Sequence, residues 1–96
     1  MTLPSIKQRL DQLLAGDLEL YEALCDQGFV PRNEGELSVD HLETARIVRT
    51  LVHELEVNWP GVEVVLRLRT ELVDTQRQVH ELSAVLRSLQ ESKDKT

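Results

Sequence analysis

The side chains best suited to chemistry in this sequence are three histidines and one cysteine. His41, His53 and His80 lie far apart, and no pair among them has the short spacing that zinc ligands share. Cys25 has no second cysteine with which to form an intrachain disulfide, which fits a reducing compartment. The sequence therefore predicts neither a bound metal nor another cofactor.

Closely spaced carboxylates are a second feature that could do chemistry, because paired acids serve acid–base catalysis. The chain has such pairs at Asp40 with Glu43 and at Glu54 with Glu56. Pairs of this kind occur on any acidic helix, and neither a glycine-rich phosphate loop nor a nucleophile motif accompanies them. We therefore predict that the protein is not an enzyme.

A more distinctive feature is the acidic segment between Asp17 and Gly28. Glu19, Glu22 and Asp26 recur there at helical spacing, without a lysine or arginine between them, and the whole chain has a net charge of -6. Because nucleic-acid affinity comes largely from basic side chains that contact phosphates, this segment would repel DNA. The pattern favours a basic protein partner, and a solvated face that only keeps the protein soluble is the alternative.

Trp59 is a further candidate for partner contact, because tryptophan is favoured at the energetic centres of interfaces. It lies in the segment Val57-Asn58-Trp59-Pro60-Gly61, which reads as a boundary between helices. A large side chain at such a boundary usually packs, so we expect Trp59 to brace the last helix on the preceding one. Exposure in an interface is the alternative. The candidate partner-binding residues are thus Glu19, Glu22, Asp26 and Trp59.

The elements that must position these residues are helices with aliphatic faces, since the only aromatic residues are Tyr21, Phe29 and Trp59. Helical spacing predicts a first helix whose apolar face is formed by Ile6, Leu10, Leu13 and Leu14. A second helix is expected to be capped by Asp17 and to end at Gly28. Its predicted apolar side is formed by Leu18, Tyr21, Leu24 and Cys25.

Residues 29–31 are predicted to form a short extended exit from the second helix, and residues 32–37 a tight turn around Gly35. This turn could be the tip of a minimal β-hairpin wing near residues 29–38. A third helix follows, with Ser38 or Asp40 as its cap and with Asp40 and Glu43 as a capping box. Its predicted apolar face consists of Leu42, Ala45, Val48, Val52 and Leu55. The arginines of this region, Arg32, Arg46 and Arg49, are expected to pair with Glu34, Glu43 or Glu56, or with acidic residues of a partner.

The last helix is predicted to run from about Pro60 to about Glu91, or about 45 Å at 1.5 Å per residue. It carries four heptads whose a and d positions are apolar apart from Thr75. A stripe this long favours a homodimer seam, with packing against the chain's own first helices as the alternative. The predicted dimer interface consists of Val65, Leu68, Leu72, Val79, Leu82, Leu86 and Leu89.

These expectations together describe an all-α protein, with a minimal β-hairpin near residues 29–38 as an optional addition. The predicted organisation is a helix-turn-helix region over residues 1–57, a dimerisation helix over residues 58–91 and a frayed tail over residues 92–96. No run of apolar residues approaches the length of a membrane span, and no secretory signal is recognisable, so a cytoplasmic protein is expected.

Two stretches of the sequence resemble known proteins. Residues 21–31, YEALCDQGFVP, resemble the end of the recognition helix and its exit in MerR-type regulators. Residues 49–68 contain the pattern L-x-x-E-L-x-V-N-W-P-G-V-x-V-x-L-x-L, which is similar to the CbpM-type chaperone modulators, a MerR-like branch. In that family a W-P-G turn joins the helix-turn-helix region to the final helix.

The resemblance implies a function that composition alone does not. CbpM-type proteins bind the J-domain of a CbpA-type co-chaperone and inhibit its stimulation of a DnaK-type chaperone. MerR-type DNA binders commonly carry an R-x-x-R pair at positions where this chain has Glu19 and Glu22. Because acidic residues replace this basic pair, a MerR-type DNA-binding regulator is only the second hypothesis. A dimeric scaffold with an unrelated partner is the third.

Overall fold

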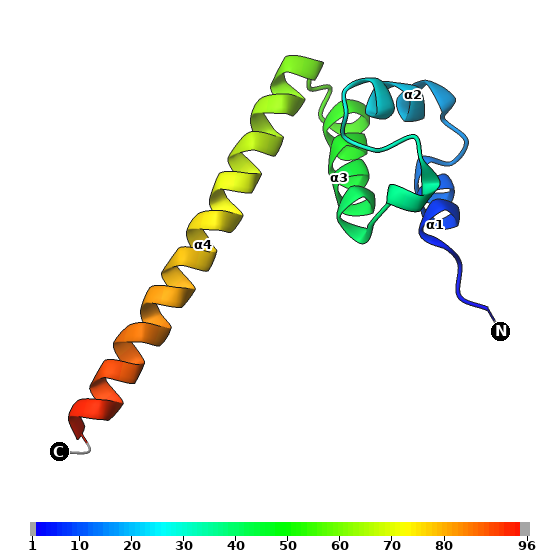
Figure 1. Cartoon of the computed structure of the whole chain (residues 1–96). Helices are drawn as coiled ribbons and strands as arrows, with labels where there is room; N and C mark the ends of the chain where they lie inside the picture. The colour runs from blue at the N-terminus through cyan, green and yellow to red at the C-terminus, as the bar shows by residue number, and fades with distance from the viewer. Residues whose placement is uncertain (1, 95–96) are drawn as a thin grey trace. The chain divides into compact units, whose positions relative to one another are not determined.

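The computed structural model describes residues 2–94, and every element assigned among them is helical. The chain divides into two compact units, one that ends at Val62 and one that starts at Glu63. The first unit contains α1 (Ile6–Leu14), α2 (Leu18–Asp26), the 3-10 turn η1 (Glu34–Glu36), α3 (Val39–Arg49) and the π-helical turn η2 (Thr50–Glu54). The long helix α4 (Trp59–Asp94) begins in the first unit and forms the second (Figure 1). The all-α prediction is confirmed for the described residues.

Local hydrogen bonds explain where the first two helices begin and end. Ser5 caps α1, because its hydroxyl accepts from the Gln8 N–H at 3.1 Å while its own N–H donates to the Gln8 side chain at 2.8 Å. Asp17 caps α2 by accepting from the Leu20 N–H at 3.0 Å. After α2, Gly28 adopts a φ of +79°, which glycine tolerates at little cost. The predicted roles of Asp17 and Gly28 are thus confirmed.

The hairpin wing suggested for residues 29–38 is wrong, because η1 forms there instead. The Asn33 side-chain oxygen accepts from the Gly35 N–H at 3.0 Å. The Leu37 N–H then donates to the Glu34 carbonyl at 3.2 Å. The backbone of this polar segment thus makes its hydrogen bonds within the turn rather than to a neighbouring strand.

A capping box other than the predicted one begins α3. The Ser38 N–H donates to His41 Nδ1 at 3.0 Å, and the Ser38 hydroxyl accepts from the His41 N–H at 3.4 Å. Ser38 has extended backbone angles, as an N-cap requires, whereas Asp40 lies inside the first turn of the helix. The predicted Asp40–Glu43 box is therefore wrong, and Ser38 is the correct one of the two predicted caps.

The π turn η2 changes the helical register at the end of α3. The Leu55 N–H donates to the Thr50 carbonyl, five residues back, at 3.1 Å. This wider turn lets Leu51 stay buried while the side chain of Leu55 is 63% exposed. The predicted apolar face of the third helix included Leu55 and is wrong at that position, because it assumed one uninterrupted α-helical period.

The core of the first unit is small and aliphatic, and α1 packs against both α2 and α3 (Figure 1). Leu18, which the sequence pattern placed on the apolar side of α2, is 74% exposed, because Leu20 takes the inward position instead. Burial of each large aliphatic side chain contributes roughly 1.5–3 kcal/mol. The buried residues are Leu10, Leu14, Leu20, Leu24, Val30, Ala45, Val48, Leu51 and Val62.

The turn before α4 is held by the side chain and the carbonyl of Asn58. Its side-chain oxygen accepts from the Gly61 N–H at 2.9 Å, and its carbonyl accepts from the Val62 N–H at 2.9 Å. The helix starts at Trp59, so Pro60 lies in the first turn, where a missing N–H costs nothing. This agrees with the predicted start at about Pro60.

The other end of α4 differs from the prediction. The helix continues to Asp94, so residues 92–94 are helical rather than a frayed tail, while Lys95 and Thr96 lie outside the described residues. Within residues 2–94, no helix combines the length and the hydropathy that crossing a membrane requires.

Gly61 gives a test of the turn between η2 and α4. A Cβ at this position would lie 2.7 Å from Val57 Cγ1 and 3.1 Å from Asn58 Oδ1. The clash costs roughly 1–3 kcal/mol, which exceeds the gain in helix propensity of about 1 kcal/mol or less. We expect Gly61→Ala to lower the free energy of unfolding by about 1 kcal/mol in urea titrations.

In Gly35→Ala the new Cβ would meet only Asn33 Oδ1 at 3.4 Å, so this control should change stability by less than about 0.5 kcal/mol. Equal effects of the two variants would show that Gly61 is not sterically required.

Candidate protein-binding site

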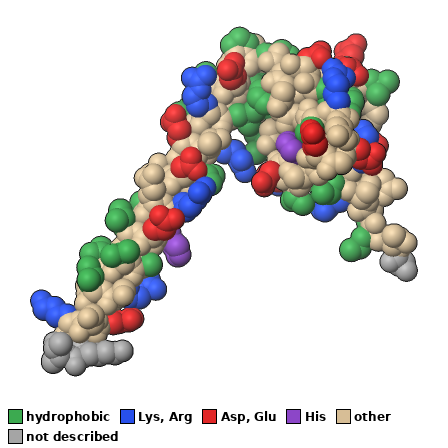
Figure 2. Space-filling view, viewed as in Figure 1, with side chains coloured by type: hydrophobic (Ala, Val, Ile, Leu, Met, Phe, Trp, Pro, Cys, Tyr) green, Lys and Arg blue, Asp and Glu red, His purple; other side chains and the backbone are tan. Residues whose placement is uncertain are grey.

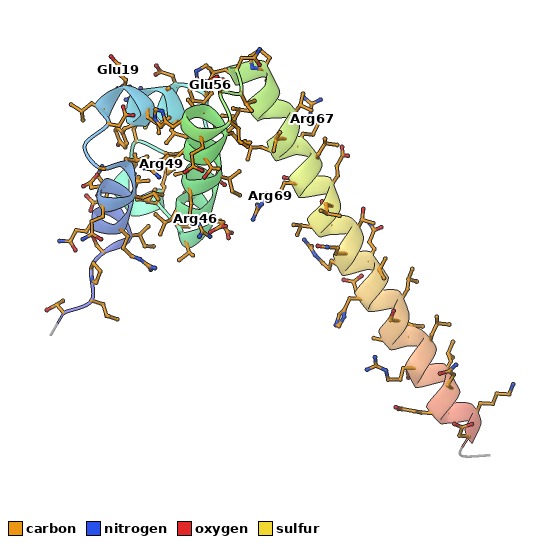
Figure 3. The ribbon with its side chains drawn as sticks, turned by 180° about the vertical axis from the view of Figure 1, so that it is seen from behind. Glu19, Arg46, Arg49, Glu56, Arg67 and Arg69 are labelled. Carbon is orange, nitrogen blue, oxygen red and sulfur yellow. The ribbon has the colours of Figure 1, made fainter. Side chains whose placement is uncertain are left out.

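The acidic residues of α2 form one exposed face of the helix. Glu19, Glu22 and Asp26 are all exposed, and their spacing of three and four residues places them along one side. Glu19 projects from the outer side of α2 (Figure 3). Since α2 itself contains no lysine or arginine, this face presents negative charge to any approaching molecule.

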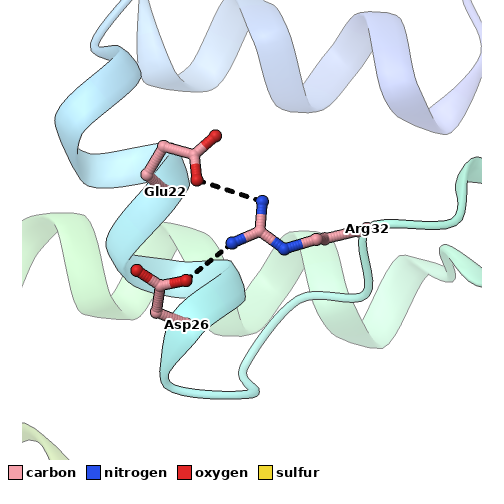
Figure 4. Close-up of polar contacts among 3 residues, drawn as sticks. All are labelled: Glu22, Asp26 and Arg32. Carbon is pink, nitrogen blue, oxygen red and sulfur yellow. Dashed lines mark hydrogen bonds and ion pairs between the residues drawn. The ribbon is translucent and has the colours of Figure 1, made fainter.

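Arg32 neutralises one end of this acidic face. Its guanidinium donates to Glu22 Oε2 at 3.0 Å and to Asp26 Oδ1 at 2.6 Å (Figure 4). The two carboxylates, Glu22 first, raise the pKa of Arg32. All three side chains are more than half exposed, so these ion pairs add little stability. The sequence expectation that Arg32 pairs with a glutamate later in the chain is wrong.

The remaining arginines of the first unit do not form a basic stripe. Arg46, labelled on α3 in Figure 3, pairs with Glu43 of the same helix, as predicted. Neither Arg49, also on α3, nor Arg9 on α1 forms an ion pair within residues 2–94. Binding to duplex DNA relies on several cations that contact phosphates together, so these arginines lend the DNA-binding hypothesis no support.

A hollow of about 200 Å³ lies beside the start of the acidic face. Asp17 forms part of its wall, since Asp17 Oδ2 lies 2.9 Å from His53 Nε2 and so joins the start of α2 to η2. The Leu20 N–H, and to a smaller extent His53, lower the pKa of Asp17 by stabilising the carboxylate. The hollow is lined by Asp17, Glu19, Leu20, Ala23, Val52, His53 and Trp59.

Trp59 is half-buried at this hollow. The chain reaches it through a bond from the Val57 N–H to the Leu51 carbonyl at 2.8 Å and through Glu56, which has a φ of +53°. The structure therefore brings Trp59 together with Glu19, as two of the four predicted partner-binding residues. Glu22 and Asp26 are absent from the lining of the hollow and instead contact Arg32.

A second surface is the apolar stripe of α4, along which hydrophobic side chains gather in Figure 2. Six of the seven predicted interface residues are more than half exposed: Leu68, Leu72, Val79, Leu82, Leu86 and Leu89. The seventh, Val65, is half-buried. Exposure of so many aliphatic side chains along one helix is unusual for a surface that contacts only water.

Neither surface has the ligands of a metal centre. Within residues 2–94, no three side chains of His, Cys, Asp or Glu lie in an arrangement that could hold a metal ion. Two of the histidines contact other residues: His53 lies against Asp17, and His41 completes the capping box of α3 with Ser38. The hollow presents acidic side chains, an indole ring and aliphatic walls.

Comparison with known proteins adds no identification. No protein-family model, no curated protein and no solved structure matches this chain. The resemblance of residues 49–68 to CbpM-type proteins thus stays a hypothesis.

Sequence reasoning missed the two contacts that shape the site. Asp17 and His53 are 36 residues apart, and neither residue type nor spacing indicates that they meet. Arg32 reaches back ten residues to Glu22, across the end of α2 at Gly28, and residue spacing alone does not indicate this contact. Only the capping role of Asp17 was readable, because caps depend on residues three positions away.

The lowered pKa of Asp17 predicts how stability changes in acid. Because the folded-state pKa lies below that of the unfolded chain, the carboxylate stabilises the fold fully above about pH 4. That contribution is lost as the pH falls through the folded-state pKa. Asp17→Asn keeps a capping side chain without a charge, so its unfolding free energy should decline less between pH 5 and pH 2 than that of the wild type.

Urea titrations at each pH measure this difference. Asp17→Ala serves as the control, since it loses the cap as well and should be less stable than Asp17→Asn at every pH. Parallel pH curves for wild type and Asp17→Asn would contradict the assigned role of the Asp17 carboxylate.

Proposed function

We propose that this chain is a homodimeric modulator that binds the J-domain of a CbpA-type co-chaperone and inhibits its stimulation of a DnaK-type chaperone. The acidic face of α2 is the observation that carries the proposal, because it presents Glu19, Glu22 and Asp26 with no basic residue in the same helix. The resemblance of residues 49–68 to CbpM-type proteins supports it separately. With such partners the chain would act in the cytoplasm.

The acidic face suits a J-domain because J-domains present a basic second helix, which normally docks on an acidic region of the DnaK-type chaperone. A protein that covers this basic helix competes with the chaperone for the same surface. Charge complementarity supplies the association rate and the specificity, while apolar contacts supply much of the affinity. Trp59 and the aliphatic walls of the hollow lie next to Glu19 and can provide these contacts.

Charge reversal on α2 tests the proposed face. We expect Glu19→Lys/Glu22→Lys to weaken binding of the isolated J-domain roughly tenfold or more, mainly through a slower association that converges with wild type at high salt. Surface plasmon resonance over a salt series measures both rates. Glu34→Lys/Glu36→Lys changes the net charge equally on η1 and should have a much smaller effect.

Arg32→Gln should change the J-domain affinity in the opposite direction in the same experiment. It frees Glu22 and Asp26 from their internal cation, so J-domain affinity should rise a few-fold at low salt. Unchanged affinity in the double lysine variant, or weaker binding by Arg32→Gln, would rule out this face as the contact surface.

The dimeric part of the proposal rests on α4. An isolated helix with an exposed heptad stripe gains stability when the stripe is buried against a second copy. We therefore propose that α4 forms the dimer seam, and the resemblance to MerR-type proteins suggests an antiparallel pairing.

A charged residue in this seam should separate the dimer. We expect Leu82→Glu, whose native side chain is 64% exposed on the stripe, to be a monomer at micromolar concentrations in sedimentation equilibrium. Ala84→Glu places the same charge two residues away on the opposite side of the helix and should remain dimeric. A monomeric wild type over the same range would contradict the proposed seam.

A further inference from the structure

The hollow beside Trp59 combines three chemical features in one place. Leu20, Ala23 and Val52 give it aliphatic walls, and Trp59 adds an aromatic surface. Glu19 adds a carboxylate at the start of the acidic face. Its volume of about 200 Å³ is that of one long side chain rather than of a whole helix.

Glu19 is the carboxylate of the hollow that is available to a partner. Both oxygens of Asp17 are already engaged, one by the Leu20 N–H at 3.0 Å and the other by His53 at 2.9 Å. Glu19, by contrast, forms no side-chain hydrogen bond or ion pair within residues 2–94, whereas Glu22 and Asp26 are bound by Arg32. The accessible negative charge of this region is therefore concentrated at Glu19.

This chemistry selects a cationic side chain with an apolar stem. Arginine and lysine lay their methylene groups on aliphatic surfaces while the charged head seeks an anion. A cation near an indole ring is further attracted to the ring face. A neutral aliphatic side chain would leave Glu19 without a partner, and an acidic side chain would be repelled by it. A metal ion fits no better, because a single free carboxylate provides too few ligands.

We propose that the hollow formed by α2, η2 and Trp59 is the seat for one arginine or lysine of the partner, held between the Trp59 ring and the Glu19 carboxylate. Arginine fits best, because its planar guanidinium stacks on an aromatic ring and binds a carboxylate at the same time. The inference rests on the proposed function, since it names the side chain of the J-domain's basic helix that fixes the docking position. Specificity among co-chaperones then depends on where along that helix this cation lies.

Double-mutant cycles with the J-domain test the seat. Each basic residue of the J-domain's second helix is replaced in turn by glutamine. Each resulting J-domain variant is titrated against wild type, Glu19→Gln and Trp59→Leu. One J-domain cation should couple with both Glu19 and Trp59. Its replacement should lower the affinity for wild type roughly three- to thirtyfold and change the affinity for either variant little. The other cations should act additively within about twofold. Glu19→Gln alters one exposed side chain and keeps the fold even if Trp59→Leu does not.

Glu36→Gln is the matched control, because it makes the same charge change on η1 and should couple with none of the J-domain cations. If wild type binds the J-domain while no cation couples with Glu19, the seat is overturned and the proposed function stands. If wild type does not bind the J-domain, the proposed function is overturned, and a peptide decides the seat separately.

The peptide is an amphipathic helix without lysine or aromatic residues that carries one arginine as its single cationic side chain, compared with the same peptide in which citrulline replaces that arginine. Citrulline has nearly the same shape and no charge. Trp59 is the single tryptophan of the chain, so its fluorescence reports directly on the hollow. The arginine peptide should bind wild type several-fold more tightly than the citrulline peptide, and the difference should vanish in Glu19→Gln. Equal binding of the two peptides to wild type would overturn the seat.

Discussion

The geometry of the candidate site depends on the π turn through which the chain leaves α3. The bond from the Leu55 N–H to the Thr50 carbonyl inserts a wider turn, and the bond from the Val57 N–H to the Leu51 carbonyl then closes the exit. Between them, Glu56 adopts a positive φ that costs a non-glycine residue roughly 1–3 kcal/mol. The surrounding bonds must outweigh this strain. The strained segment is the one that directs His53 toward Asp17 and leads into Trp59.

Internal ion pairs determine how much of the acidic face remains available to a partner. Arg32 occupies Glu22 and Asp26, but these side chains are exposed, and exposed ion pairs contribute at most about 1 kcal/mol each. A partner cation can therefore replace Arg32 at little cost, whereas the Asp17 carboxylate is tied to both a helix cap and His53. The face thus combines a fixed wall at Asp17, a free charge at Glu19 and an exchangeable pair beyond it.

Features set by neighbouring residues could be predicted from the sequence, and features set by distant contacts could not. The caps at Asp17 and Gly28, the aliphatic core and the long heptad helix follow from local spacing. The π turn is invisible to a pattern with one fixed period, so the predicted apolar face of the third helix failed at Leu55. In the same way, Glu19 and Trp59 were each recognisable as candidates, while the hollow that joins them depends on packing across 40 residues of sequence.

The division of the chain into two units has a consequence for binding. The first unit buries nine aliphatic residues and carries the acidic face, while α4 beyond Val62 presents an apolar stripe that makes no comparable core. If α4 pairs with a second copy as proposed, each dimer has two acidic faces, one on the first unit of each protomer. Two such faces raise the effective concentration of a dimeric co-chaperone only when its J-domains match their separation.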